Sequence, residues 1–198
     1  MMIFPDRQLI VLAVPKTGTM GLARLLGPRA GINLNAPPQA KHIGLAQVQT
    51  RILPLAGPAA RDWRSFALIR HPVDWLGSWY RYRLRDGFAG RPDSTQGVSF
   101  ADFIRAWLRP GERPAYAEIG RQSWFMQDRD GKFGVDHLFR YEAETEYMAF
   151  LSDIFGEKLE SPRWNVSPRA PLDLPPRLRD RLETALEDDI AMWRSARH

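Results

Sequence analysis

The chain contains no cysteine. This absence excludes disulfide bonds, thiolate metal sites and a cysteine nucleophile, because each of them needs a thiol. It leaves the redox compartment of the protein undefined. Histidine is also sparse: the chain has 4 scattered histidines, and neither an HExxH pair nor the spacing of an EF-hand occurs. The sequence therefore predicts no metal centre.

Long apolar runs are missing as well. The most apolar N-terminal run, Leu9 to Val14, is far shorter than the roughly 20 residues that a membrane helix needs. Asp6 interrupts the N-terminal region, and no small-residue cleavage pattern follows it. We therefore expect no transmembrane segment and no secretion signal, and the default localisation is the cytoplasm.

Apolar and basic residues are plentiful. The chain has 198 residues, of which 44% are hydrophobic and 26% are charged, and this composition predicts one globular domain over residues 1–198. The net charge of +5 favours anionic partners, such as a phosphorylated nucleotide or a nucleic acid. Charge alone does not choose between these partners, and a solvated basic surface has the same composition. Nothing in the sequence indicates an oligomeric state.

Strand-like and helix-like patterns alternate along the chain. Strands alternating with helices predict an α/β fold in which a central parallel β-sheet is flanked by helices. The connections between parallel strands are expected to be right-handed. We expect strands over residues 8–14, 31–35, 65–69 and 135–141. We expect helices over residues 20–26, 42–55, 115–127, 145–155 and 178–193, and two more that begin at Pro72 and at Ser99. Ser99 and Asp102 should form a capping box, and Gly156 should end the helix over 145–155. Residues 87–97 are expected to form a surface loop.

The segment between the first strand and the first helix reads VPKTGTM over residues 14–20. The free amides and the dipole of a helix N-terminus favour an anion at this position. Gly18 allows the backbone to approach a ligand, and Lys16 supplies a flexible positive charge. Thr17 and Thr19 add hydroxyl donors. The sequence therefore predicts a phosphate-binding loop.

This loop is not a Walker A motif, because Pro15 stands where a glycine should precede the lysine and the upstream glycine is missing. It resembles the 5′-phosphosulfate loop of sulfotransferases that use 3′-phosphoadenosine 5′-phosphosulfate (PAPS), which commonly reads Pro-Lys-Thr-Gly-Thr or Pro-Lys-Ser-Gly-Thr. The resemblance implies a sulfotransferase fold of the P-loop type, PAPS as sulfuryl donor and no metal. It implies that the PAPS-binding residues are Pro15, Lys16, Thr17, Gly18, Thr19 and Met20. Many members have Ser or Thr where Met20 stands, so one hydroxyl contact to the 5′-phosphate is absent or replaced.

A second segment, FALIRHPVDWLGSW over residues 66–79, supplies Arg70 at a strand end and Ser78 two turns into the following helix. It resembles the family's 3′-phosphate segment, in which the matching arginine and serine bind the phosphate that separates PAPS from other adenine nucleotides. The alternative interpretation is that Arg70 pairs with Asp74 and that Ser78 faces solvent.

Two later segments resemble the family less specifically. Residues 139–142, FRYE, are similar to a strand end at which a tyrosine-glutamate pair is frequent. Residues 164–169, WNVSPR, look like the late Asn-x-Ser loop of bacterial, carbohydrate-type members. That resemblance implies that Asn165 and Ser167 bind the cofactor and that the acceptor is a carbohydrate or another small molecule.

In the reaction that the resemblance implies, the hydroxyl or amine of an acceptor attacks sulfur, and Lys16 stabilises the charge on the bridging oxygen. His42 is the first candidate for the catalytic base, because the ordinary pKa of histidine is about 6.5 and because family members often have His or Glu at this position. The alternatives are that His42 only begins a helix and that Glu142 is the base.

Two other function classes stay open. A P-loop kinase needs magnesium and usually an acidic residue at the end of a neighbouring strand, where this chain has Arg70. A nonenzymatic RNA-binding module would use the basic aromatic stretch 75–85, which has no RRM or KH signature. We therefore expect no nucleic-acid partner. The sequence leaves the acceptor undefined, since variable segments such as the 87–97 loop and the surfaces around Trp107 and Trp124 would select it.

Overall fold

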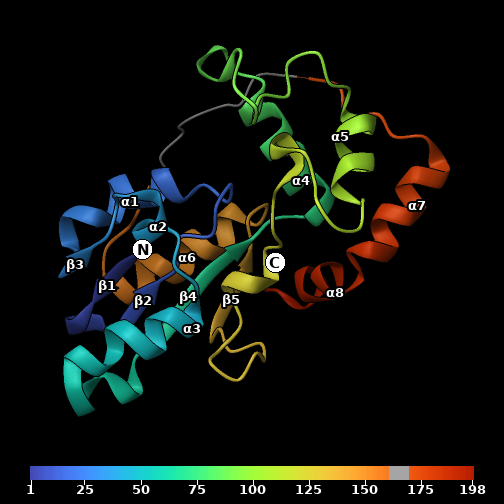
Figure 1. Ribbon diagram of the computed structural model, residues 1–198. Coiled ribbons are helices and arrows are strands. Elements are labelled where there is room, and N and C mark those ends of the chain that lie inside the picture. The colour runs from blue at the N-terminus through green and yellow to red at the C-terminus, as the bar shows by residue number, and fades with distance from the viewer. Residues whose placement is uncertain (161–169) are drawn as a thin grey trace. The chain divides into compact units, whose positions relative to one another are not determined.

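The computed structural model of the protein describes residues 1–160 and 170–198 (Figure 1). The described residues divide into two compact units. Unit 1 holds residues 1–70, 122–160 and 192–198, and unit 2 holds residues 71–121 and 170–191. Compactness does not test whether either unit folds alone, so the expectation of a single domain remains a prediction.

Unit 1 is built on a five-stranded sheet with the strand order β3-β1-β2-β4-β5. Strands β2, β4 and β5 run parallel to one another, whereas β1 is antiparallel to both β2 and β3. The α/β class is therefore confirmed, but the sheet is mixed rather than fully parallel. The strands are β1 Met2–Phe4, β2 Leu9–Val11, β3 Ile32–Asn33, β4 Arg64–Ile69 and β5 His137–Arg140.

Strand β1 was not predicted. A 3₁₀ turn, Pro5–Arg7, is followed by Gln8 in the left-handed conformation with φ 50°, and this turn returns the chain so that β1 pairs with β2. The predicted strand 8–14 is shorter in the structure, because only Leu9–Val11 form the strand. The Leu12 amide still donates to the Phe66 carbonyl at 2.9 Å, so the chain stays beside β4 as it approaches the loop.

Both faces of the sheet are covered, which explains the apolar character of its strands. Successive residues of a strand point to opposite faces. Phe66 and Leu68 of β4 belong to one core cluster, which also holds residues of α1 (Thr19–Leu26) and α6 (Glu144–Phe155). Ala67 and Ile69 belong to the cluster on the other face, with residues of α3 (Leu45–Gln47) and of the π-helical turn Val48–Ile52. Figure 1 shows α1, α3 and α6 beside the strands.

Two of the predicted helices in unit 1 are confirmed. Helix α1 follows the loop as expected, and α6 ends at Gly156, which takes the left-handed conformation with φ 68°. The continuous helix over 42–55 is wrong. The short helix α2 (Pro38–Lys41) precedes it, α3 begins after Gly44, and the chain turns into 3₁₀ structure from Leu53 to Asp62, where Pro54 and Pro58 cannot donate backbone hydrogen bonds.

The predicted helix over 115–127 is also wrong. The structure has two separate 3₁₀ turns there, Ala115–Ala117 and Ser123–Phe125. The apolar residues of this segment do not form one helix face. Ala117 and Ile119 are buried in unit 2, whereas Met126 is buried in unit 1.

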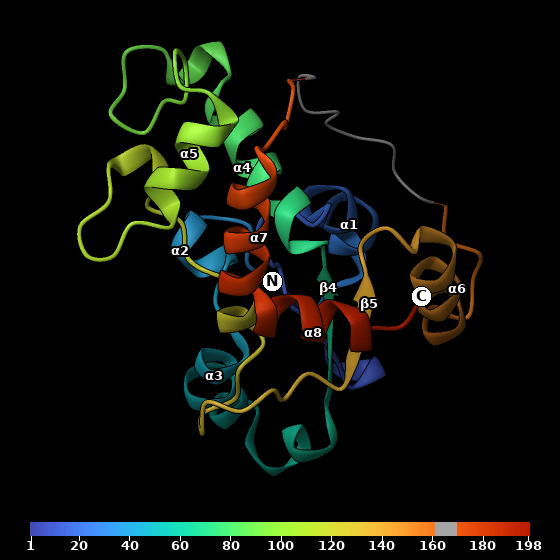
Figure 2. The same cartoon turned by 90° about the vertical axis from the view of Figure 1, so that its right-hand side faces the viewer.

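Unit 2 is helical. Helices α4 (Pro72–Arg83), α5 (Phe100–Trp107) and α7 (Pro176–Ala185) share one apolar core and lie close together in both views (Figure 2). Pro72 occupies the first turn of α4, as predicted. The predicted helix 178–193 is divided into α7 and α8 (Glu187–Ser195), and Leu186 between them stays buried at 2% exposure.

The predicted capping box at the start of α5 is half formed. Ser99 Oγ accepts from the Asp102 amide at 3.1 Å, but the Asp102 carboxylate accepts from the Ser99 hydroxyl at 2.6 Å and not from its amide. Within the part of the chain that the structure describes, no helix is long and apolar enough to cross a bilayer.

Candidate functional site

The loop between β2 and α1 has an unusual backbone. Lys16 and Gly18 both take the left-handed conformation, with φ 66° and φ 74°, and Thr17 lies between them. Turns that contain left-handed residues are typical of the concavities of backbone N–H groups that bind anions. Gly18 is also the N-cap of α1, so the loop leads directly into the positive end of a helix dipole. Both features are typical of a backbone that binds an anion.

The lysine carries a conformational cost. A left-handed backbone costs an L-residue about 1–2 kcal/mol, because its Cβ approaches the carbonyl oxygen. Glycine has no such cost, yet the chain has lysine at this position. Residues held in strained backbone conformations cluster at functional sites. The strain at Lys16 is therefore an observation in favour of a functional role that the sequence alone does not give.

The other residues of the loop divide into shape-forming and outward-facing residues. The hydroxyl of buried Thr17 donates to the Val14 carbonyl at 2.9 Å, so its proton closes the loop and is engaged within the protein. Pro15 is buried and Thr19 is 9% exposed at the start of α1. Met20, in contrast, is 48% exposed. Of the two predicted hydroxyl donors, Thr17 thus donates within the loop, whereas Thr19 donates to no residue of the loop.

Two neighbouring strand ends meet the loop. Strands β2, β4 and β5 are parallel, so their carboxyl ends lie at the same edge of the sheet, which is where α/β proteins bind ligands. Arg70 follows β4 and Tyr141 follows β5. The Arg70 guanidinium carbon lies 5.0 Å from the centre of the Tyr141 ring. A Cβ placed on Gly18 would lie 3.0 Å from Cε2 of the same ring. The structure thus brings together the loop, Tyr141 and Arg70.

The backbone of Arg70 is held in place by the side chain of Gln122, which is 1% exposed. The Arg70 amide donates to Gln122 Oε1 at 3.0 Å, and Gln122 Nε2 donates to the Arg70 carbonyl at 2.8 Å. Arg70 Nε is buried and has no hydrogen-bond partner among residues 1–160 and 170–198. A buried donor without an acceptor costs about 1–3 kcal/mol, so an anionic oxygen bound here would remove that cost.

His42 directly follows α2 and does not begin a helix. Its Nδ1 donates to the Ala13 carbonyl at 2.5 Å, which leaves Nε2 with a free lone pair in the neutral ring. Burial lowers the pKa of His42, and the positive charges of Lys41 and Lys16 lower it further, against the hydrogen bond to Ala13, which raises it. The ring is therefore neutral at pH 7 and able to accept a proton at Nε2.

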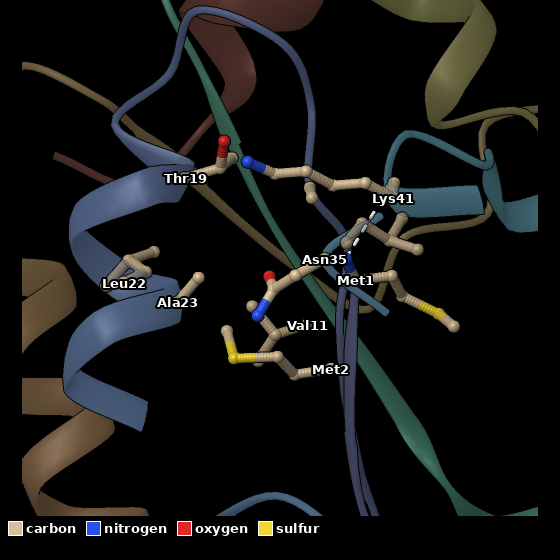
Figure 3. A pocket seen from close by; sticks show the side chains of 10 residues that line it. Met1, Met2, Val11, Thr19, Leu22, Ala23, Asn35 and Lys41 are labelled. Carbon is tan, nitrogen blue, oxygen red and sulfur yellow. Dashed lines mark hydrogen bonds between the residues drawn. The ribbon is translucent and has the colours of Figure 1, made fainter. Parts of the chain in front are cut away.

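Lys41 is a site residue that the sequence did not reveal. Figure 3 shows its side chain extending toward Thr19 at the start of α1. Burial lowers the pKa of Lys41. A cavity of about 10 Å³ lies between Lys41, Thr19 and Asn35, with space for about one water molecule and not for a nucleotide. The sequence shows Lys41 beside His42, but not the turn that carries its side chain toward α1.

The remaining predicted residues are not brought to this edge within unit 1. Ser78 belongs to unit 2, where it is 4% exposed on α4. Asp74, the alternative partner of Arg70, has its carboxylate 3.9 Å from His71 Nδ1. Asn165 and Ser167 lie outside the described residues. The proposed roles of Ser78, Asn165 and Ser167 therefore stay predictions.

The other candidates for the base and for acceptor contacts are placed as follows. Glu142 accepts a hydrogen bond from Trp193 Nε1 at 3.1 Å, so one of its oxygens has a structural contact. Trp107 is 3% exposed and donates to the Ile119 carbonyl at 2.9 Å, which makes it a core residue of unit 2. Trp124 is 59% exposed and remains a candidate for an acceptor contact.

No group of three or more His, Cys, Asp or Glu side chains is placed to hold a metal ion in residues 1–160 and 170–198. The described site instead gathers cationic and amide donors, namely Lys16, Lys41, Arg70 and the loop backbone. No protein-family model, curated protein or solved structure matches the chain.

Proposed function

We propose that the protein is a sulfotransferase that transfers a sulfuryl group from PAPS to a hydroxyl or amine of an acceptor. The observation that carries this proposal is the loop after β2, in which Lys16 and Gly18 take left-handed conformations directly before α1. A strained lysine among amide donors suits a ligand that presents one anionic centre at which charge develops during the reaction. The sulfotransferase fold of the P-loop type is part of the same proposal.

PAPS supplies the sulfuryl group and leaves as 3′-phosphoadenosine 5′-phosphate (PAP). The acceptor forms a new bond to sulfur, and the bond between sulfur and the bridging oxygen of the 5′-phosphate breaks with its electrons on that oxygen. Lys16 stabilises the charge that develops there. His42 accepts the acceptor's proton at Nε2, because Nδ1 is already committed to Ala13. Lys41, whose side chain extends toward Thr19, adds positive charge to the same region (Figure 3).

Arg70 is the residue that we assign to the 3′-phosphate. Its buried Nε lacks an acceptor in the described part of the chain, and its backbone is fixed by Gln122. Ser78, Asn165 and Ser167 would complete the nucleotide contacts. A carbohydrate acceptor and a cytoplasmic location belong to the proposal in the same way.

A thermal-shift panel tests the assignment of the nucleotide. The panel compares PAP, ATP with magnesium, and a single-stranded oligonucleotide. At about 100 times its Kd, PAP should stabilise the protein by about 2.7 kcal/mol, which raises the melting temperature of a chain of this size by about 5–10 °C. Selective stabilisation by ATP with magnesium would support a kinase instead, and stabilisation by the oligonucleotide alone would support an RNA-binding module.

Transfer of radioactive sulfate from labelled PAPS to pooled glycans, lipids and small alcohols tests the reaction itself. Lys16→Ala should reduce turnover by about 100-fold or more, because preorganised charge of this kind is worth about 3 kcal/mol. Lys132→Ala is the matched control, since Lys132 is an exposed lysine of the same unit. Equal turnover of Lys16→Ala and the unaltered protein would remove Lys16 from the mechanism.

A further inference from the structure

Tyr141 contacts both halves of the candidate site. One edge of its ring faces the loop, where a Cβ on Gly18 would lie 3.0 Å from Cε2 and 3.6 Å from Cδ2. The Arg70 guanidinium lies over the same ring at 5.0 Å from its centre. The ring is therefore a spacer between the backbone of the loop and the cation that follows β4.

The position of this spacer is fixed by the sheet. The Tyr141 amide donates to the Ile69 carbonyl at 2.7 Å, which continues the pairing of β4 and β5 for one more residue beyond their ends. Ile69 is fully buried, and Gln122 holds the backbone of Arg70 next to it. Tyr141 and Arg70 thus directly follow two paired strands, β5 and β4, and the pairing of these strands sets the separation of the two residues.

The contact with the ring leaves the donors of the arginine usable. A guanidinium is planar, and its N–H groups point outward in its own plane. When its face rests on an aromatic ring, its edge stays available for an anion. Both contacts involve the ring of Tyr141, its edge toward the loop and its face toward Arg70, so the ring and not the hydroxyl is the part of the side chain that the inference concerns.

We infer that Tyr141 is a positioning residue that determines specificity for the 3′-phosphate, because its ring sets the distance between the loop that holds the 5′ end of the nucleotide and Arg70. The inference rests on the proposed function and goes beyond it. A nucleotide with phosphates at both the 3′ and 5′ positions would engage both elements. A nucleotide with only the 5′-phosphate would engage the loop alone.

The test compares the affinities of two ligands by isothermal titration calorimetry. PAP carries both phosphates, whereas AMP carries only the 5′-phosphate. The ratio of the Kd for AMP to the Kd for PAP therefore measures recognition of the 3′-phosphate. Tyr141→Phe keeps the ring and should keep the ratio. Tyr141→Leu and Tyr141→Met remove the aromatic face and should each lower the ratio about tenfold, mainly through weaker binding of PAP. Tyr141→Met retains the bulk of a long side chain and serves if the leucine variant folds poorly.

Tyr82→Leu is the matched control, because Arg85 lies over the Tyr82 ring at a similar distance, 5.2 Å, in unit 2. Its ratio should equal that of the unaltered protein. An unchanged ratio in folded Tyr141→Leu or Tyr141→Met overturns the inference and leaves the proposed function intact. Equal affinity of the unaltered protein for PAP and AMP also overturns the inference, whereas no binding of PAP at all overturns the proposed function.

Discussion

Lys16→Gly should be inactive, like Lys16→Ala, but more stable than Lys16→Ala. Lys16→Ala and Lys16→Gly both remove the ammonium group, so every contact of that group is lost equally in the two variants. They differ only at the backbone. Alanine keeps the strain of φ 66°, whereas glycine adopts this conformation freely.

The magnitude follows from two opposing terms. The left-handed conformation costs alanine about 1–2 kcal/mol, and glycine has no such cost. Glycine loses more conformational entropy on folding, which offsets about 0.4–1 kcal/mol of that advantage. Lys16→Gly should therefore be more stable than Lys16→Ala by about 0.5–1 kcal/mol. This difference corresponds to about 1–4 °C in melting temperature for a chain of this size.

Urea denaturation measures the two free energies of unfolding, and the sulfate-transfer assay measures turnover. Gly156→Ala is an internal standard, because Gly156 is left-handed with φ 68° and ψ 21° and a Cβ there would meet no atom within 4 Å. Its loss of stability should match the difference between the two Lys16 variants. If Lys16→Gly is no more stable than Lys16→Ala while Gly156→Ala is destabilised, the left-handed backbone at Lys16 is refuted.

Three further predictions concern the loop and its neighbours. Gly18→Ala should lower the free energy of unfolding by about 1 kcal/mol or more and weaken PAP binding, because it adds backbone strain and a Cβ 3.0 Å from Tyr141. Urea denaturation and calorimetry measure the two effects, and an unchanged Kd for PAP would contradict the close contact. Lys41→Met should weaken PAP binding about tenfold in calorimetry, whereas Lys132→Met should not; equal Kd values would remove Lys41 from the site. The Kd for PAP should decrease as pH falls from about 7.5 to about 6, since burial and nearby cations lower the pKa of His42 in the free protein and a bound anion raises it, so that binding takes up a proton. His42→Asn should flatten this dependence, and a slope that persists in that variant would assign it to another group.

The order of the elements around residues 14–20 could be predicted from the sequence, but the conformation of the loop between them could not. A buried aliphatic run, a Pro-Lys-Thr-Gly-Thr segment and a helical pattern predicted a strand, a turn and a helix, and β2, the loop and α1 follow in that order. Gly18 was expected to let the backbone approach a ligand, and its left-handed conformation, which glycine adopts readily, is a finding of the structure. The left-handed conformation of Lys16 could not be predicted, because lysine has no preference for it.

Features that depend on contacts distant in the sequence were missed. Strand β1 is only three residues long, and on one side it pairs with β3, whose residues 32 and 33 come much later in the chain. The helix expected over 115–127 fails, because its apolar residues pack in the cores of both units rather than along one helix face. Tyr141 gains its place only through the parallel pairing of β4 and β5, which no local pattern reveals.

A crystal structure of the protein with PAP tests the central claim most directly. The 5′-phosphate should lie against the backbone amides of residues 16–19 and within hydrogen-bond reach of Lys16 Nζ, and the 3′-phosphate should contact Arg70, including the Nε that has no acceptor in the described part of the chain. PAP bound elsewhere, or bound with the loop unoccupied and Lys16 out of reach of the 5′-phosphate, would contradict the assignment of this loop to the phosphosulfate.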